Sequence, residues 1–343
     1  ANPTQAKYLL SVERQQKVKE ALYLFLLQKR EENELSQAFT AYNTRIVAPP
    51  HGSMLPMSPV RKNILMVACA LGLLIPVVII FICENMNTRV RGRKDLESVT
   101  VPFIGEIPLF TRKKKGIFRK KPQEVRAIVV KEGSRDIINE AFRVLRTNLE
   151  FMTGKDKASN VIIVTSFNPG SGKSFLTMNI AVSFAIKGKK VLVIDGDLRH
   201  GSASSYIDSP TKGLSDYLGG RIDNLNEIIV TNPKQKYLDI LPVGTIPPNP
   251  TELLFDDRLK QVIDTVREQY EYVLIDCPPI ELVADTQIIE KLADRTIFVV
   301  RAGLLELSML AELEKIYGEK KYKNMSLILN GTEGSGGRYG YRY

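Results

Sequence analysis

A stretch of small and polar residues with the chemistry of a phosphate-binding loop lies between Val161 and Ser174, VIIVTSFNPGSGKS. An apolar run leads into this loop, and a helical pattern begins at Lys173. In such a loop the backbone amides and the helix N-terminus hold phosphate oxygens, the lysine reaches the outer phosphates, and the hydroxyl binds Mg²⁺. The strict pattern GxxxxGK[ST] is broken, because Phe167 stands where the first glycine is expected. A chance GSGKS in an ordinary loop is the alternative.

Two acidic motifs follow other apolar runs. VLVIDGDLR carries Asp195, Asp197 and Arg199, and YVLIDCPP carries Asp276. In an open parallel sheet the ligand crevice lies beyond the carboxyl ends of the strands, so these three carboxylates would converge on the loop. Three acids beside a GKS loop form a constellation for metal and phosphate, which favours nucleotide binding over a chance sequence.

These motifs require a parallel sheet to position them. Between about residues 131 and 330, helical stretches alternate with short Val, Ile and Leu runs that lack a period of two, as strands buried on both faces do. We therefore expect an α/β fold with a doubly wound, mostly parallel sheet of the P-loop NTPase type. The expected strands are VIIVTS, KVLVID, LDILPVG, YVLIDCPP and RTIFVVRAG.

An apolar segment lies upstream of this sheet. Residues 64–83 are 20 consecutive uncharged residues, and a helix of that length spans about 30 Å, the thickness of the hydrocarbon core of a bilayer. A buried core helix is the alternative, but core helices of this length rarely lack a polar position. The following segment, 89–121, holds 11 Lys and Arg against three acids. This placement points to a membrane surface rather than to nucleic acid, with the C-terminal side in the cytoplasm.

The composition excludes several other kinds of site. The 343 residues are 44% hydrophobic and 25% charged, which is typical of a globular protein. Three cysteines without a CxxC pair and only two histidines give neither a disulfide framework nor a zinc site. The first residue is Ala1 and no signal peptide follows it, so we expect the chain to be part of a longer protein.

Taken together, the motifs resemble those of the bacterial tyrosine kinases, specifically the kinase-bearing polysaccharide co-polymerases. SFNPGSGKS, VLVIDGDLR and VLIDCPP match the three nucleotide motifs of that family. EAFRVLRTNLEF, KGLSDYLGG, GTIPPNPTELL and VPFIGEIP extend the resemblance over almost the whole chain. The resemblance implies an ATP- and Mg²⁺-dependent protein tyrosine kinase of the bacterial inner membrane that phosphorylates itself and regulates capsule or exopolysaccharide polymerisation and export.

The same resemblance implies partners and an order of domains. Expected partners are identical subunits in a ring, the inner membrane, the polysaccharide export machinery and a cognate tyrosine phosphatase, without nucleic acid. The expected parts are the end of an extracytoplasmic helical stalk (1–48), a Pro-rich approach (49–62), a transmembrane helix (63–83), a basic juxtamembrane linker (84–130), a cytoplasmic ATP-binding kinase domain (131–330) and a Gly- and Tyr-rich tail (331–343).

The resemblance also assigns roles at the nucleotide site. The expected catalytic residues are Lys173, Asp195, Asp197, Arg199 and Asp276, with Asp195 and Asp197 where a substrate hydroxyl would approach and Arg199 steadying the transferred charge. The expected Mg²⁺ ligands are Ser174, Asp195 and Asp276. The expected ATP contacts are Asn168, Pro169, Gly170, Ser171, Gly172, Lys173, Ser174, Phe175 and Asn330.

Asn330 is the least constrained of these assignments. It ends the apolar run MSLILN, where a strand would bring it near the nucleotide, and we expect it to contact the base. A simple strand-terminating asparagine is the alternative.

The C-terminal sequence GTEGSGGRYGYRY carries a tyrosine cluster, Tyr339, Tyr341 and Tyr343. The sequence is too rich in glycine to pack, so incidental aromatic residues in a mobile end are one interpretation. In the family that the chain resembles, such clusters are autophosphorylation sites donated to the active site of a neighbouring subunit. We favour that interpretation and expect phosphorylation in trans.

The segment EAFRVLR places Glu140, Arg143 and Arg146 near one face of a helix. A solvated charged face with an i,i+3 ion pair is one interpretation. The resemblance favours another, an intersubunit contact that builds a ring.

Two other functions remain open at this point. A membrane-tethered ATPase switch, like the related septum-site and partition ATPases, would use the same motifs without phosphorylating protein. A purely structural protein with an inactive nucleotide site fits poorly, because Lys173, Ser174 and all three aspartates are present. The tyrosine cluster favours the kinase over the switch, which has no use for it.

Overall fold

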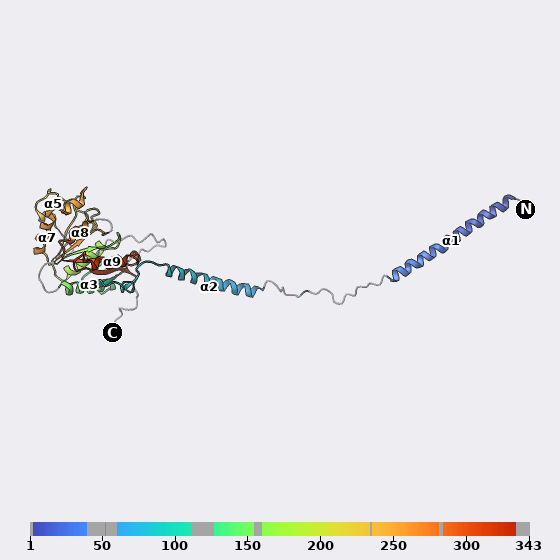
Figure 1. Ribbon diagram of the computed structural model, residues 1–343, viewed down its shortest axis with the longest axis horizontal. Helices are drawn as coiled ribbons and strands as arrows, with labels where there is room; N and C mark the ends of the chain where they lie inside the picture. The colour runs from blue at the N-terminus through green and yellow to red at the C-terminus, as the bar shows by residue number, and fades with distance from the viewer. Residues whose placement is uncertain are drawn as a thin grey trace, which may run out of the picture. The chain divides into compact units, whose positions relative to one another are not determined.

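The computed structural model describes residues 3–39, 52, 60–110, 127–153, 160–233, 235–280 and 284–333. The chain divides into two units, Ala1–Ile82 and Cys83–Tyr343. The first unit contains the helix α1 (Pro3–Phe39) and most of the helix α2 (Arg61–Asn85). The second contains the sheet and the helices that pack on it (Figure 1).

The helix α2 carries the apolar segment that was predicted to span a membrane. Its stretch Arg61–Ile82 has a mean hydropathy of 3.0, and no other helix in the described part of the chain is both long and apolar enough to cross a bilayer. The 25 residues of α2 rise about 37 Å as a helix. Pro76 lies inside α2 without ending it, as membrane helices tolerate. The crossing itself stays a prediction.

An eight-stranded sheet organises the second unit, in the order β1-β8-β7-β2-β6-β3-β5-β4. Every neighbouring pair is parallel except β4 and β5. The predicted mostly parallel α/β fold is therefore confirmed. The strands are β1 (Phe103–Pro108), β2 (Asn160–Thr165), β3 (Val191–Asp195), β4 (Val230–Thr231), β5 (Leu238–Leu241), β6 (Tyr272–Asp276), β7 (Arg295–Arg301) and β8 (Ser326–Thr332).

Helices cover both faces of the sheet. In β2, Val161 and Ile163 belong to one hydrophobic core, whereas Ile162 and Val164 belong to the other. Each face of the strand is buried, which is why its sequence is continuously apolar. Residues of α3 and α4 line the core that contains Ile162, and residues of α7, α8 and α9 line the other. The helices of this unit are α3 (Ile137–Thr153), α4 (Lys173–Ile186), α5 (Leu214–Leu218), α6 (Pro250–Leu254), α7 (Asp257–Gln269), α8 (Asp285–Glu290) and α9 (Met309–Gly318), with short 3₁₀ helices at Arg93–Leu96, Ser204–Ile207 and Leu225–Glu227.

The first strand of the sheet comes from the segment predicted to be a linker. β1 pairs in parallel with β8, and the amide of Val90 donates to the carbonyl of Leu305 at 2.9 Å. The folded unit therefore begins well before residue 131, and the predicted linker 84–130 is wrong for this part. The pattern was missed because an edge strand buries few side chains, here Ile104 and Ile107. The basic sequence RKKKGIFRKK falls in 111–126, outside the described residues.

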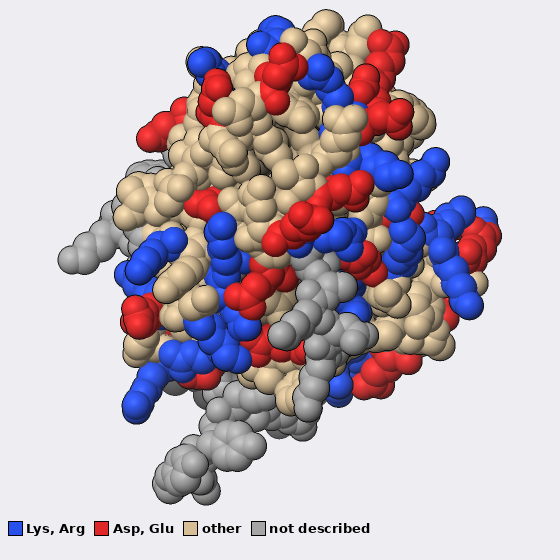
Figure 2. Space-filling model, turned by 90° about the vertical axis from the view of Figure 1, so that its left-hand side faces the viewer, with Lys and Arg blue, Asp and Glu red and all other residues tan. Residues whose placement is uncertain are grey.

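The surface of the second unit carries both signs of charge. On the face shown in Figure 2, Lys and Arg side chains are interspersed with Asp and Glu among the coloured residues. A continuous basic stripe is what nucleic-acid binding uses, and the coloured residues of this face do not form one.

Candidate nucleotide and metal site

The phosphate-binding loop connects β2 to α4. Asn168, Pro169, Gly170, Ser171 and Gly172 all lie in this connection, and α4 begins at Lys173. The hydroxyls of Ser166 and Ser171 both donate to the carbonyl of Asn168 at 2.8 Å. The loop is thus folded on itself through side chains, which leaves backbone amides for phosphate oxygens.

Asn330, at the end region of β8, supports this loop. Its side-chain amide donates to the carbonyl of Ser171 at 2.8 Å, and the residue is only 4% exposed. Gly172 has a φ of +87°, and a side chain there would collide with the Asn330 amide. The close approach requires glycine both for its conformation and for the space. The structure therefore places Asn330 beneath the loop, and the predicted base contact stays a prediction.

Phe167 fills the position where the strict loop pattern has a glycine. Its side chain is 2% exposed and packs edge-on against Phe298 of β7, with ring centroids 4.9 Å apart. This position belongs to the core rather than to the phosphate site. The large side chain is therefore compatible with a working loop.

The first turn of α4 supplies the remaining loop residues. Lys173 is 9% exposed, and its ammonium lies 3.4 Å from the Ser166 hydroxyl. Phe175 directs its ring to Phe142 of α3, with centroids 6.0 Å apart. The predicted ATP contact of Phe175 stays a prediction.

Asp195 and Asp276 lie side by side at the ends of neighbouring strands. They are register partners of β3 and β6, and Val164 of β2 is the next partner of Asp276. Both carboxylates are buried, at 0% and 1% exposure. One oxygen of Asp195 accepts from the amide and the hydroxyl of Ser204, at 2.6 and 2.7 Å. Among the described residues, the other oxygen of Asp195 and both oxygens of Asp276 make no well-formed hydrogen bond, although the Asp197 amide and the Ser174 hydroxyl lie close enough to lower the pKa of Asp195 and Asp276, respectively.

Burial of these two carboxylates changes their ionisation. Burial, together with the charge of Asp195, raises the pKa of Asp276 to about 8, against the opposite effects of Ser174 and Lys173. Burial also raises the pKa of Asp195 to about 6, although its hydrogen bonds with Ser204 lower it. Two adjacent buried acids create an unfavourable concentration of negative charge that a cation would neutralise.

This donor set fits a divalent metal. In the described part of the chain, no cluster of three or more His, Cys, Asp or Glu residues could hold a metal alone. Two carboxylates and the Ser174 hydroxyl leave coordination positions for phosphate oxygens and water, as is usual for a hard cation bound with a nucleotide. The three predicted ligands are consistent with such a site.

Asp197 and Arg199 follow Asp195 in a turn. One oxygen of Asp197 accepts from the backbone amides of Arg199 and His200, both at 3.2 Å. The Arg199 guanidinium bonds to Asp285 and Thr251. The sequence did not single out Ser204, Thr251 or Asp285. Thr251 lies in GTIPPNPTELL, but no spacing there marks it as functional.

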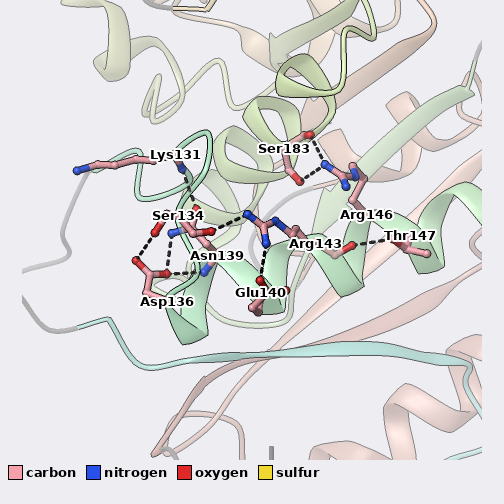
Figure 3. A network of polar contacts seen from close by, with 9 residues as sticks. All are labelled: Lys131, Ser134, Asp136, Asn139, Glu140, Arg143, Arg146, Thr147 and Ser183. Carbon is pink, nitrogen blue, oxygen red and sulfur yellow. Dashed lines mark hydrogen bonds and ion pairs between the residues drawn. The ribbon is translucent and has the colours of Figure 1, made fainter. Parts of the chain in front are cut away.

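Glu140, Arg143 and Arg146, the three residues predicted to contact another subunit, lie on α3. In this structure each of them contacts other residues of the same chain (Figure 3). Arg143 pairs with Glu140, as the i,i+3 interpretation expected, and also donates to the carbonyl of Ser134 at 2.6 Å. Arg146 donates to the carbonyl of Ser183 on α4 at 2.9 Å. The intersubunit contact stays a prediction. Tyr339, Tyr341 and Tyr343 lie outside the described residues.

Comparison with known proteins shows the family to which the chain belongs. Residues 159–327 match the AAA domain family, and residues 3–84 match the G-rich domain on putative tyrosine kinase. The solved kinase domain of Escherichia coli tyrosine kinase ETK is 30% identical, with a TM-score of 0.61, over 74% of this chain and 100% of that domain. The chain belongs to the bacterial tyrosine kinases. The BceF tyrosine kinase domain is also 30% identical, with a TM-score of 0.58, over 71% of this bacterial tyrosine kinase and 99% of that domain.

Full-length relatives extend the similarity to the first unit. Tyrosine-protein kinase etk of Escherichia coli K12 is 31% identical over 316 residues, which are 89% of this bacterial tyrosine kinase and 43% of the relative. The putative tyrosine-protein kinase AmsA of Erwinia amylovora is 32% identical over 335 residues, which are 93% of this chain and 45% of the relative. The chain thus spans less than half the length of these relatives.

Proposed function

We propose that this bacterial tyrosine kinase transfers the γ-phosphoryl group of ATP to the tyrosine cluster of a neighbouring subunit. The observation that carries the proposal is the pair of fully buried acids, Asp195 and Asp276, which are register partners at strand ends beside the loop that leads into Lys173. A bound divalent cation would stabilise such a pair, and the cation would in turn hold the nucleotide phosphates. Because the chain belongs to the bacterial tyrosine kinases, we infer that the acceptor of the phosphoryl group is a tyrosine hydroxyl.

The described residues divide the work of phosphoryl transfer. The loop amides and Lys173 hold the phosphates. Ser174, Asp195 and Asp276 hold Mg²⁺, which neutralises phosphate charge when it is bound. The tyrosine oxygen forms a bond to the γ phosphorus while the bond from phosphorus to the ADP oxygen breaks. The phenol proton passes to a carboxylate, for which Asp197 is suited because it is less deeply buried than the metal-binding pair.

The proposed membrane location and the proposed ring of subunits involve α2 and α3, respectively. We place α2 across the bacterial inner membrane, with the sheet in the cytoplasm, because basic residues follow the helix. Identical subunits form a ring through Glu140, Arg143 and Arg146 of α3. The ring works with the capsule or exopolysaccharide machinery, and a cognate phosphatase reverses the phosphorylation. AmsA and the other relatives are named tyrosine kinases, which supports a kinase over an ATPase switch.

The experiment that tests this function separates kinase from switch. The whole chain, solubilised in detergent, is incubated with ATP and Mg²⁺, and both phosphotyrosine and released phosphate are measured. A kinase forms phosphotyrosine that disappears when EDTA is present and returns when excess Mg²⁺ is added. Release of phosphate without any phosphotyrosine would instead establish the membrane-tethered ATPase switch.

A further inference from the structure

Arg199, Asp285 and Thr251 form a closed triangle of hydrogen bonds. The Nε of Arg199 donates to Oδ2 of Asp285 at 3.1 Å, and its Nη2 donates to the hydroxyl oxygen of Thr251 at 3.0 Å. The Thr251 hydroxyl in turn donates to Oδ1 of Asp285 at 2.6 Å. Three segments that are far apart in the sequence therefore meet at one guanidinium, since Thr251 lies in α6 and Asp285 begins α8.

The geometry makes Asp285 the fixed corner of this triangle. Its side chain is 1% exposed, whereas that of Arg199 is 37% exposed. A buried carboxylate must keep its charged partner, but a partly exposed arginine on its own would sample many rotamers. Two directed contacts on the planar guanidinium select one orientation.

Asp285 is also tied to the loop that carries Asp276. The hydroxyls of Thr286 and Thr165 both donate to the carbonyl of Pro278, at 2.9 and 2.8 Å. Pro278 lies two residues after Asp276, and Thr165 ends β2. The start of α8 is thereby held at a fixed place relative to the end of β2 and to the metal-binding acid. An arginine held by Asp285 is therefore held relative to the ends of β2 and β6, which carry the loop and the acid of the proposed phosphate site.

We propose that Asp285 and Thr251 are positioning residues that hold the Arg199 guanidinium in the orientation in which it stabilises the transferred phosphoryl group. The inference rests on the proposed function and deepens it by adding two residues to the site. Their effect passes through Arg199, so it belongs to the chemical step rather than to ATP binding.

The test compares four variants of the whole chain in detergent: Arg199→Gln, Asp285→Asn, Thr251→Val and the double variant Arg199→Gln with Asp285→Asn. Initial rates of phosphotyrosine formation at increasing ATP give kcat and KM. We expect kcat to fall about tenfold in Asp285→Asn and about threefold in Thr251→Val, while KM for ATP stays within about twofold. The double variant should be no slower than Arg199→Gln alone, because both changes remove the same oriented guanidinium.

Controls separate positioning from simple stability. Thr265→Val is the matched threonine change, since its hydroxyl bonds within α7 to the carbonyl of Gln261, and it should leave kcat unchanged. Thermal unfolding of each variant shows whether it folds. If the buried Asp285→Asn does not fold, the half-buried Thr251→Val decides the question.

The inference is overturned by any of three results. One is an unchanged kcat in Arg199→Gln, a second is an unchanged kcat in the folded Asp285→Asn or Thr251→Val variant, and a third is a double variant whose loss equals the product of the two single losses. If the unaltered chain makes no phosphotyrosine, the proposed kinase function fails, and the same comparison of kcat and KM in ATP hydrolysis then decides the positioning role.

Discussion

The guanidinium of Arg146 on α3 donates a hydrogen bond of 2.9 Å to the backbone carbonyl of Ser183 on α4. The helix α4 is the one that begins at the phosphate-binding Lys173. Arg143, from the same charged motif, bonds instead to Glu140 and to the loop before α3. Two arginines that the sequence treats alike thus have different structural surroundings.

Arg146→Ala should therefore lower stability more than Arg143→Ala. Each variant loses a charge-assisted bond to a partly buried carbonyl, which costs about 1.5–3 kcal/mol. The bond of Arg146 joins α3 to α4, whereas the contacts of Arg143 stay within α3 and the residues just before it, so Arg146→Ala should also loosen the packing of the two helices. Thermal unfolding of the two variants measures the difference, and light scattering measures the predicted loss of the ring in both. Equal losses of Tm would show that the contact with Ser183 contributes little.

Lys173→Met should abolish phosphotyrosine and leave the fold intact. The lysine acts on phosphate charge, and such electrostatic contributions are about 3 kcal/mol or more of transition-state stabilisation, or at least about a hundredfold in rate. Phosphotyrosine detection gives the activity, and the Tm without nucleotide should match the unaltered protein within about 2 °C. Retained phosphotyrosine would remove this loop from the active site.

Asp276→Asn should stabilise the metal-free protein at high pH. In the folded protein the pKa of Asp276 is raised from 3.8 to about 8, so the folded state binds more protons than the unfolded state between these values. The free energy of unfolding from this group therefore falls as pH rises through 8, and the ionised form opposes folding.

The uncharged asparagine at position 276 should remove this loss of stability at high pH. We expect the variant to unfold a few degrees above the unaltered protein at pH 9, since about 1 kcal/mol corresponds to roughly 2–4 °C in a domain of this size. The difference should shrink as pH falls from 8 and should be smallest below about pH 4, where the carboxyl of Asp276 is largely protonated in both states. Calorimetry in EDTA measures both, and a difference that does not grow with pH would contradict the buried charge. The variant should form no phosphotyrosine.

Asn330→Ala distinguishes support of the loop from recognition of the base. If the bond to the Ser171 carbonyl is what matters, the loop loosens and the affinities for ATP and GTP fall by a similar factor, about fivefold to tenfold for one buried hydrogen bond. If Asn330 reads adenine, only the affinity for ATP falls. Titration with fluorescent analogues of both nucleotides measures the ratio, and an altered ratio would favour the base contact.

Phosphorylation should occur between subunits. A Lys173→Met protein keeps its tyrosines but has no activity, and a protein with Tyr339, Tyr341 and Tyr343 changed to Phe keeps activity but has no acceptor. Mixing the two should produce phosphotyrosine on the lysine variant at micromolar concentration. Arg143→Ala in both proteins should lower this rescue by weakening the predicted contact. No rescue with the contact intact would mean that each tail serves its own site.

Much of the fold could be predicted because buried parallel strands have a strong pattern. The strands β2, β3, β5, β6 and β7 are buried on both faces, so their sequences are continuous apolar runs that can be recognised as strands of a parallel sheet. β1 and the two-residue strand β4 carry too little apolar sequence for that argument. The acids and the phosphate-binding loop of the candidate nucleotide site lie at or directly after the carboxyl ends of β2, β3 and β6. The topology of a parallel sheet is enough to bring such residues together.

The supporting residues could not be predicted in the same way. Asp285 approaches Arg199 only because α8 and the turn after β3 meet in space, 86 residues apart. Ser204 and Thr251 have no spacing that relates them to the motifs. Their role depends on hydrogen bonds between segments that are distant in sequence, and a pattern read along one chain contains no signal for such contacts.

The place of β1 in the sheet has a consequence for how the protein is made. A ribosome produces Phe103–Pro108 before the other strands of the described sheet, yet the only neighbour of β1 in that sheet is β8. Phe103 pairs with Leu327, and β8 reaches the remaining strands through β7. The first strand of this sheet to be synthesised therefore cannot pair until the last strand of the same sheet has been made. Closure of this edge is a slow, non-local step that follows synthesis of the other strands of the sheet.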